Sequence, residues 1–208
     1  MTAPQQLFTI ILILGATAVV PAQAKEQRLL VVGDSIGAGY GLSSSQKSWV
    51  DLLSDYFEPY DWTVINASVS GDTTTDALRK IHRLLENYQP EYVVVELGGN
   101  DALRATPIHL IADNLNRIIR SSQRQGAMTL LIGVTLPPNY GQRYIKRFEK
   151  MYREVAENTQ SLFVSFAHTE IGTDAKYLQF DRIHPNHLAQ PFLFEAVKKP
   201  LKAELYLP

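Results

Sequence analysis

A serine, a histidine and an aspartate stand where they could form a nucleophilic site. Ser35 follows an apolar run in the segment LLVVGDSIGAGYGL, and Asp181 and His184 lie close together near the C-terminal end. A serine nucleophile needs a base to accept its proton and a third group to orient that base. Three residues apart in a turn, the Asp181 carboxylate can accept the Nδ1–H of His184 and leave Nε2 directed toward Ser35. The alternative is a loop without chemistry, in which Pro185 ends the turn and Asn186 caps the following helix.

The glycines around Ser35 raise the alternative of a phosphate-binding loop, but their spacing argues against it. They fall at positions 33, 37, 39 and 41, whereas a dinucleotide loop reads G-x-G-x-x-G and a Walker loop ends in Gly-Lys-Ser/Thr. The pattern G-x-S-x-G at 33–37 is that of the nucleophile elbow in α/β-hydrolases. Several strands precede the elbow in that fold, whereas Ser35 would follow the first strand here. The α/β-hydrolase fold is therefore only an architectural alternative.

Two further segments could supply donors to an oxyanion that forms on the attacked carbonyl group. The backbone N–H of Ser35, at an expected helix start, is one candidate. Gly71 can bring its N–H close because no side chain obstructs it, and Asn100 offers a side-chain amide. Taken separately, the segment around Gly71 reads as a helix N-terminus and the segment around Asn100 as a turn that ends a strand. Their occurrence in order at successive strand ends favours a common site.

Five short apolar runs predict strands, and the segments between them have helical spacing. The runs are 28–32, 62–66, 92–97, 128–134 and 162–166, and apolar faces at 49–56, 78–85, 108–119, 144–155 and 188–201 predict helices. This alternation predicts a parallel sheet with helices on both faces, as a doubly wound three-layer α/β/α sandwich. The functional site of such a fold lies beyond the carboxyl ends of its strands, where all the segments above fall.

Composition predicts one globular domain and limits its partners. The 208 residues are 45% hydrophobic with a net charge of -1, so the overall charge indicates neither nucleic acid nor an anionic membrane as a partner. The absence of cysteine excludes disulfides, thiolate metal sites, a cysteine nucleophile and lipid attachment through a cysteine. The sequence does not fix the oligomeric state, although a monomer is the simplest expectation.

The first 24 residues have the character of a signal peptide. They hold an apolar run at 7–20 and no charged side chain, and they end in Ala22-Gln23-Ala24, the small-x-small pattern of a cleavage site. We therefore expect a signal peptide at 1–24, a hydrolase domain at 25–208, and an exported protein, periplasmic or secreted, without stable membrane insertion after cleavage. An uncleaved anchor or a buried first helix is the alternative.

The ordered blocks GDS at 33–35, Gly71, GND at 99–101 and DRIH at 181–184 resemble the four blocks of the SGNH (GDSL-type) hydrolase superfamily. The stretches ASVSGDTT, ELGGNDALR, LPPNYGQRY and DRIHPNHLAQPF are similar to its bacterial periplasmic thioesterase, lysophospholipase and arylesterase branch. The resemblance covers essentially all of 25–208 and implies a flavodoxin-like fold with a five-stranded parallel sheet. It also implies Ser35 as nucleophile, His184 as general base and Asp181 as its orienting group, with an oxyanion hole of Ser35, Gly71 and Asn100.

The resemblance further implies a serine hydrolase of small carboxylic esters and thioesters that uses no metal and no cofactor. We expect Leu136, Pro137 and Tyr140 to line the acyl site. Two positions depart from the pattern of related members, since Gly37 stands where a serine is expected and Arg182 where a glycine is expected. Arg182 could narrow the acyl pocket or alter its charge, so it affects substrate preference and not the chemistry.

Two other functions compete with the serine hydrolase. The Gly-Asp and Gly-Asn blocks echo those of metal-dependent phosphoesterases, which need histidine ligands beside the acids. Of the five histidines only His184 is so placed. A non-catalytic periplasmic acyl-binding module could keep the fold without turnover, but the complete set of serine, asparagine, aspartate and histidine argues against it.

Overall fold

The computed structural model describes residues 26–166, 174–205 and 207, so the predicted signal peptide lies outside the described residues. Five strands form one parallel sheet in the order β2-β1-β3-β4-β5. They are β1 (Gln27–Gly33), β2 (Trp62–Asn66), β3 (Tyr92–Glu96), β4 (Met128–Gly133) and β5 (Leu162–Ser165). The predicted flavodoxin-like fold with a five-stranded parallel sheet is confirmed.

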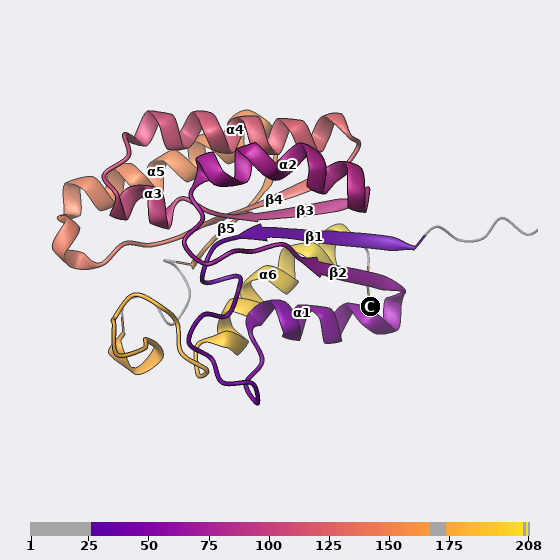
Figure 1. Ribbon diagram of the computed structural model, residues 1–208, viewed down its shortest axis with the longest axis horizontal. Coiled ribbons are helices and arrows are strands. Elements are labelled where there is room, and N and C mark those ends of the chain that lie inside the picture. Colours follow the sequence, from indigo (N-terminus) through magenta and orange to yellow (C-terminus); the bar gives the residue numbers. More distant parts are fainter. Residues whose placement is uncertain (1–25, 167–173, 206, 208) are drawn as a thin grey trace, which may run out of the picture.

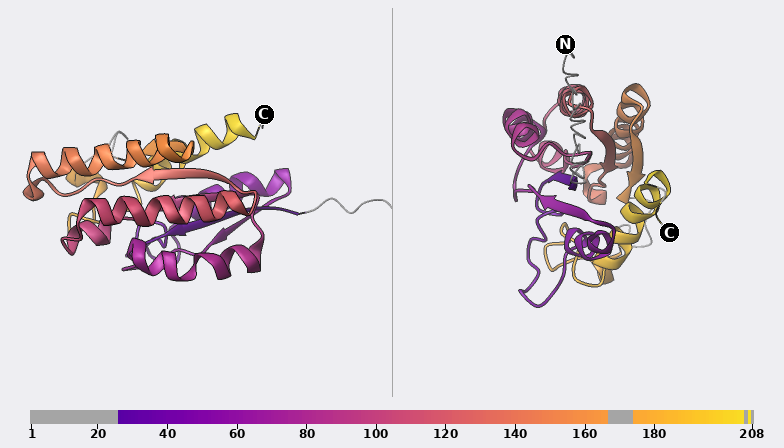
Figure 2. Two further views of the ribbon diagram at one scale, coloured as in Figure 1. Left: turned by 90° about the horizontal axis from the view of Figure 1, so that it is seen from above. Right: turned by 90° about the vertical axis from the view of Figure 1, so that its right-hand side faces the viewer.

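Helices cover both faces of the sheet (Figure 1). One face carries α2 (Thr74–Tyr88), α4 (Ile108–Arg124) and α5 (Gln142–Thr159), and the other carries α1 (Trp49–Phe57) and α6 (Gln190–Glu204). The end-on view in Figure 2 shows the sheet between the two helical layers. Within the described ranges no helix combines the length and apolar character needed to cross a bilayer.

The two faces of the sheet pack into two apolar cores. Along β1, Leu30 and Val32 enter the core under α2 and α4, whereas Leu29 and Val31 enter the core over α1 and α6. Successive side chains of a strand point to opposite faces. A central parallel strand is therefore apolar at every position, which is why β1 and β3 read as continuous apolar runs.

The chain that follows β1 forms consecutive turns, not the helix start that we expected at Ser35. The N–H of Ala38 donates to the Asp34 carbonyl at 3.0 Å, and α1 begins only at Trp49. Gly39 and Gly41 have φ of +68° and +76°, which glycine adopts at little cost and a right-handed helix excludes. These turns place Ser35 just beyond the carboxyl end of β1, in a segment that is not helical.

The last helix and its approach also differ from expectation. α6 begins at Gln190, and Asn186 does not cap it. The Asn186 side chain instead donates to the carbonyls of Lys176 and Leu178, at 2.8 and 3.0 Å, and so closes the loop before the helix.

Several short helices occur among the described residues, and none of them was predicted. Helix α3 (Gly99–Leu103) is too short to show helical periodicity in the sequence. The single 3-10 turns are η1 (Glu58–Tyr60), η2 (Pro138–Tyr140) and η4 (Ala175–Tyr177). The loops that carry α3, η2 and η4 all lie at the carboxyl edge of the sheet, at the left of Figure 1.

Candidate active site

Ser35, His184 and Asp181 form a continuous chain of hydrogen bonds at the carboxyl edge of the sheet. His184 Nε2 lies 2.9 Å from Ser35 Oγ, and His184 Nδ1 lies 2.6 Å from Asp181 Oδ2. With the ring proton on Nδ1, the ring donates to Asp181 and Nε2 accepts from the Ser35 hydroxyl. This is the geometry that proton removal from a serine nucleophile requires.

The loop that carries His184 is folded by the Asp181 carboxylate itself. Asp181 Oδ1 accepts the backbone N–H of Ile183 at 2.9 Å and that of His184 at 3.0 Å, which leaves Oδ2 for the ring. Partial desolvation raises the pKa of Asp181, but the hydrogen bonds from the His184 ring and from these two N–H groups outweigh it and hold the pKa below its usual value. Asp181 is therefore ionised when His184 has to carry a proton.

Of the candidate oxyanion donors, Ser35 and Asn100 line one cavity, and Gly71 lies in the neighbouring loop after β2. Both amide hydrogens of Asn100 are engaged, since Nδ2 donates to Asp34 Oδ2 at 3.1 Å and to the Asp72 carbonyl at 3.0 Å. Gly71 has a φ of +88°, and its carbonyl accepts from Arg104 at 3.0 Å. Asn100 thus ties the turn after β1 to the loop that contains Gly71.

Two buried carboxyl groups lie beneath the nucleophile turn, and sequence reasoning missed the deeper one, Glu96. Glu96 Oε2 accepts the N–H of Gly37 at 3.0 Å and that of Asp34 at 3.4 Å, on either side of Ser35. Burial, and next the Asp34 charge, raise the pKa of Glu96 well above its usual value. Burial raises the pKa of Asp34 to about 6, against the hydrogen bond from the Ile36 N–H.

A second residue that sequence reasoning missed is Tyr40. Its ring lies 4.6 Å from the His184 ring, between centroids. It stands between two glycines of the opening segment, so it reads as part of a turn. Glu96 did leave a signal, because it is the one charged residue in the apolar run 92–97.

The four residues that we expected to contact substrate share a cavity with Ser35 and His184. This cavity has a volume of about 550 Å³. Leu136, Pro137 and Tyr140 line it from the segment after β4, and Arg182 lines it from the His184 loop. The structure therefore places an apolar wall beside the nucleophile and a cation near the base.

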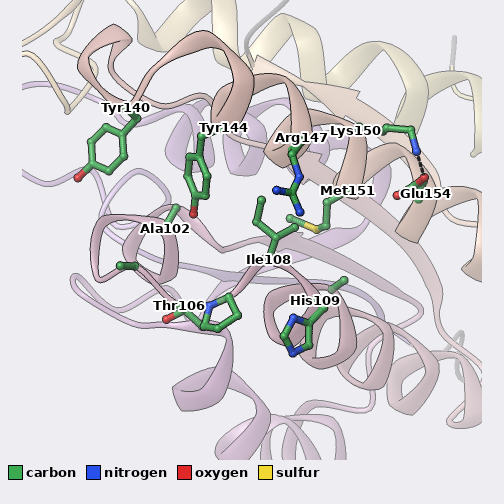
Figure 3. A pocket seen from close by; sticks show the side chains of 13 residues that line it. Ala102, Thr106, Ile108, His109, Tyr140, Tyr144, Arg147, Lys150, Met151 and Glu154 are labelled. Atoms are coloured by element: carbon green, nitrogen blue, oxygen red, sulfur yellow. Dashed lines mark hydrogen bonds and ion pairs between the residues drawn. The ribbon is translucent and has the colours of Figure 1, made fainter.

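A second cavity of about 920 Å³ adjoins the first, because Tyr140 lines both. It lies between α5 and the chain that leads from α3 into α4. In Figure 3 the side chains of Tyr144, Arg147 and Met151 face Ile108 and His109 across it. None of the hydrogen-bonded groups described above lines this second cavity.

Within the described ranges, no group of three or more His, Asp or Glu side chains is arranged so that it could hold a metal ion.

Comparison with known proteins gives consistent matches along the chain. A family model described as GDSL-like Lipase/Acylhydrolase matches residues 31–190. Esterase TesA of Pseudomonas aeruginosa is 43% identical over 189 residues, which are 90% of this chain and 94% of the relative. The thioesterase 1/protease 1/lysophospholipase L1 of Escherichia coli K12 is 37% identical over 179 residues, 86% of this chain and 85% of the relative.

Solved structures are also similar to this chain over most of its length. The crystal structure of TesA matches with a TM-score of 0.81 at 43% identity, and the match covers 85% of this chain and 99% of that one. The psychrotrophic esterase EstA from Pseudoalteromonas sp., solved in a form inhibited by monoethylphosphonate, matches with a TM-score of 0.79 at 37% identity, over 86% and 99% of the two chains.

Proposed function

Because this chain belongs to the GDSL-like lipase and acylhydrolase family and is a hydrolase of the GDSL esterase and thioesterase type, we propose that it cleaves carboxylic esters and thioesters through an acyl-enzyme on Ser35. The observation that carries the proposal is the hydrogen-bond chain from Asp181 through His184 to Ser35, with distances of 2.6 and 2.9 Å.

Acylation begins with proton transfer from the Ser35 hydroxyl to His184 Nε2. The serine oxygen attacks the carbonyl carbon, and the carbonyl oxygen becomes an oxyanion. The bond to the alcohol oxygen or thiol sulfur then breaks, and the leaving atom takes the proton back from His184. Asp181 stabilises the charged imidazole ring throughout. A positioned general base of this kind contributes about 10²–10⁴-fold in rate.

The oxyanion is stabilised by the backbone N–H of Ser35, the N–H of Gly71 and the side-chain amide of Asn100. Because both Asn100 amide hydrogens are already engaged, one of them is shared with the oxyanion or exchanged for it. This donor is held in place before substrate binds, which limits the reorganisation that the reaction requires.

Deacylation repeats the sequence with water in place of the serine. His184 takes a proton from water, the resulting hydroxide attacks the acyl carbonyl carbon, and the bond to Ser35 Oγ breaks. The serine oxygen recovers its proton from His184, and the carboxylic acid is released.

The acyl group of the substrate contacts the apolar wall of Leu136, Pro137 and Tyr140. Tyr140 also lines the larger cavity of about 920 Å³, which gives long acyl chains a place to extend. Arg182 sets the charge at the mouth of the site and disfavours cationic substrates.

Export completes the proposal, with residues 1–24 removed after Ala24 and a monomeric domain at 25–208. N-terminal sequencing of protein recovered from the periplasm or the medium tests the cleavage. Light scattering of the same material tests the oligomeric state.

The test of the chemistry is hydrolysis of p-nitrophenyl esters, from acetate to palmitate, with and without EDTA. Activity that resists EDTA, is lost in Ser35→Ala and is kept in Ser44→Ala, an exposed serine of the same loop, supports the proposal. A phosphonate that labels the wild type and not Ser35→Ala identifies the nucleophile directly.

Other outcomes contradict the proposal. Activity that remains in Ser35→Ala, or that EDTA abolishes, would instead support a metal-dependent phosphoesterase. Phosphonate labelling and turnover both absent, with acyl compounds still bound, would indicate a binding module.

A further inference from the structure

Three exposed apolar side chains lie on the two segments that flank the Ser35 cavity, and one of them, Ile183, lines it. Phe180 is 105% exposed, Tyr40 53% and Ile183 42%. Phe180 and Ile183 lie in the loop that carries His184, and Gln179 of the same loop donates from Nε2 to the Tyr40 carbonyl at 2.6 Å. We call Tyr40, Phe180 and Ile183 the apolar rim. Single exposed apolar residues are ordinary on protein surfaces, whereas a group of them at the mouth of a cavity indicates an interaction site.

A cation stands within this rim in a strained conformation. Arg182 lies between Phe180 and Ile183 in sequence and has a φ of +57°, in the left-handed region that disfavours every residue with a Cβ atom. Asp61, Gln89, Ala105 and Gln160 share this conformation, so the backbone alone does not assign a function to Arg182.

The guanidinium of Arg182 is also available to a ligand. The nearest acid in sequence, Asp181, is occupied by the His184 ring at 2.6 Å. Among the described residues no ion pair involves the Arg182 side chain. The rim therefore offers apolar side chains and an unpaired cation at one place.

We propose that the apolar rim docks the protein onto a phospholipid surface, with Phe180 and Ile183 entering the acyl-chain boundary and Arg182 binding lipid phosphate. Apolar side chains beside a basic residue suit this boundary, where phosphates lie directly above acyl chains. A guanidinium matches a phosphate through two parallel hydrogen bonds.

The placement of the rim gives docking a consequence for the reaction. Ile183 and Arg182 line the cavity that holds Ser35 and His184, so an acyl ester leaving the lipid surface would enter next to the nucleophile. This use rests on the proposed function, whereas docking itself does not.

The opposite edge of the sheet supplies a control position. Met128 is the first residue of β4 and is 41% exposed. β1 also begins at this edge, since the strands are parallel (Figure 1). Attachment through the residues before β1 would therefore bring Met128 toward lipid, and docking through the rim would bring Phe180.

The experiment places a tryptophan at each edge of the full chain, as Phe180→Trp and Met128→Trp. The two native tryptophans, Trp49 and Trp62, are buried and give a constant background. With vesicles of phosphatidylethanolamine and phosphatidylglycerol, we expect the emission of Phe180→Trp to shift to the blue and to be quenched by brominated lipid, and that of Met128→Trp to stay unchanged. A shift in Met128→Trp alone, or in neither variant, overturns the proposal.

Vesicle co-sedimentation then measures what each rim residue contributes. We expect Phe180→Ser to weaken partitioning about tenfold through lost apolar burial, and Arg182→Gly about fivefold through one lost cation at an anionic surface. Met128→Ser, the matched control, should partition as the wild type does. Partitioning of Phe180→Ser equal to the wild type overturns the proposal.

Hydrolysis of a soluble short-chain ester separates docking from chemistry. The Phe180 side chain does not line the Ser35 cavity, so Phe180→Ser should keep the wild-type kcat/KM. Vesicle binding without any hydrolysis would contradict the proposed function and leave docking intact, and the reverse result would overturn docking alone. A wild-type dimer that Phe180→Ser dissociates without lipid would make the rim a protein interface and overturn the proposal.

Discussion

The two loops that meet at the bond between Ser35 and His184 are held in opposite ways. The nucleophile turn after β1 is buried, and Glu96 of β3 accepts two of its N–H groups while the Asn66 side chain donates to the Gly37 carbonyl at 2.9 Å. The loop of His184 is largely exposed. It is held by one β-bridge, between Leu178 and Pro185, and by side-chain hydrogen bonds within the loop and to Tyr40. Its link to the core is Gln190 of α6, whose Nε2 donates to the Asn186 carbonyl at 3.1 Å.

Because the two loops are held differently, the positions of Ser35 and His184 depend on different parts of the structure. The position of Ser35 is part of the folding of the core, because its supports belong to β2 and β3. The position of His184 depends on local contacts that unfolding of the core need not involve. Substitutions beneath the nucleophile should therefore change activity and stability together, whereas substitutions in the His184 loop should change them separately.

The largest difference between the effect on activity and the effect on stability is expected for Asp181→Asn. The variant loses the acceptor that orients and stabilises the charged His184 ring, so kcat should fall about 10²–10⁴-fold. The melting temperature should change little, because the side chain is 38% exposed and its contacts are local. Steady-state kinetics on a soluble ester and thermal unfolding of the same samples measure both quantities. A large drop in melting temperature would show that the two loops are not held differently.

Removing the acceptor that supports the nucleophile turn should lower stability and activity together. Glu96→Leu leaves the buried N–H groups of Gly37 and Asp34 without an acceptor, at about 1–3 kcal/mol of unfolding free energy for each. The turn then shifts, and a displacement near 1 Å costs up to about 10²-fold in kcat. Urea unfolding and steady-state kinetics, with kcat referred to the folded fraction, measure both.

Glu96→Gln is the matched control, because its amide oxygen can accept both N–H groups. It should keep most of kcat, and KM should change less than kcat in both variants, since the apolar wall of Leu136, Pro137 and Tyr140 lies outside the nucleophile turn. The rate of phosphonate labelling should follow kcat. A Glu96→Leu variant that is less stable but turns over normally would make Glu96 a structural residue without a positioning function.

A smaller effect is expected on the pH dependence of stability, for which the wild type is compared with Glu96→Gln. The native state holds the proton of Glu96 to a higher pH than the unfolded chain, whose value is near 4.5. Unfolding therefore releases a proton above that pH, and the wild type loses stability relative to Glu96→Gln as the pH rises, by up to about 1.4 kcal/mol per pH unit. Urea unfolding from pH 4.5 upward measures the difference, and parallel curves would contradict it.

The smallest effect is expected for Arg182→Gly in the exposed loop. Glycine adopts the left-handed conformation of this position without the strain of about 1–2 kcal/mol that a Cβ atom causes. The added freedom of the unfolded chain offsets about 0.4–1 kcal/mol of this gain. Urea unfolding should show equal or slightly higher stability. A clear loss would mean that the guanidinium stabilises the loop, although no ion pair among the described residues involves it.

The sheet could be predicted from the sequence because each strand is a short run of β-branched or other apolar residues, separated from the next by a segment of helical spacing. Helix α3 could not, because five residues are too few to show a helical period. The helix start that we expected at Ser35 is absent, because Gly39 and Gly41 have a left-handed backbone conformation that keeps a helix from forming there.

The residues of the site also fall into two groups, those that the sequence could indicate and those that it could not. Ser35, Asn100, Asp181 and His184 could be proposed as a group because each has chemistry of its own. The first two follow predicted strands, and the last two precede the last predicted helix. Glu96 could not be assigned, because its importance comes from two backbone N–H groups that only the folded β1 turn brings to it.

The bond between Ser35 and His184 joins residues 149 positions apart. Another long-range bond, from the Trp49 N–H to Gln190 at 2.9 Å, holds α6 against α1. Closing loops of this length is entropically costly and comes late in folding. A chain whose sheet has formed but whose C-terminal segment has not docked carries a nucleophile without its base. Recovery of activity during refolding therefore reports the arrival of this last segment, and it should lag behind the recovery of secondary structure.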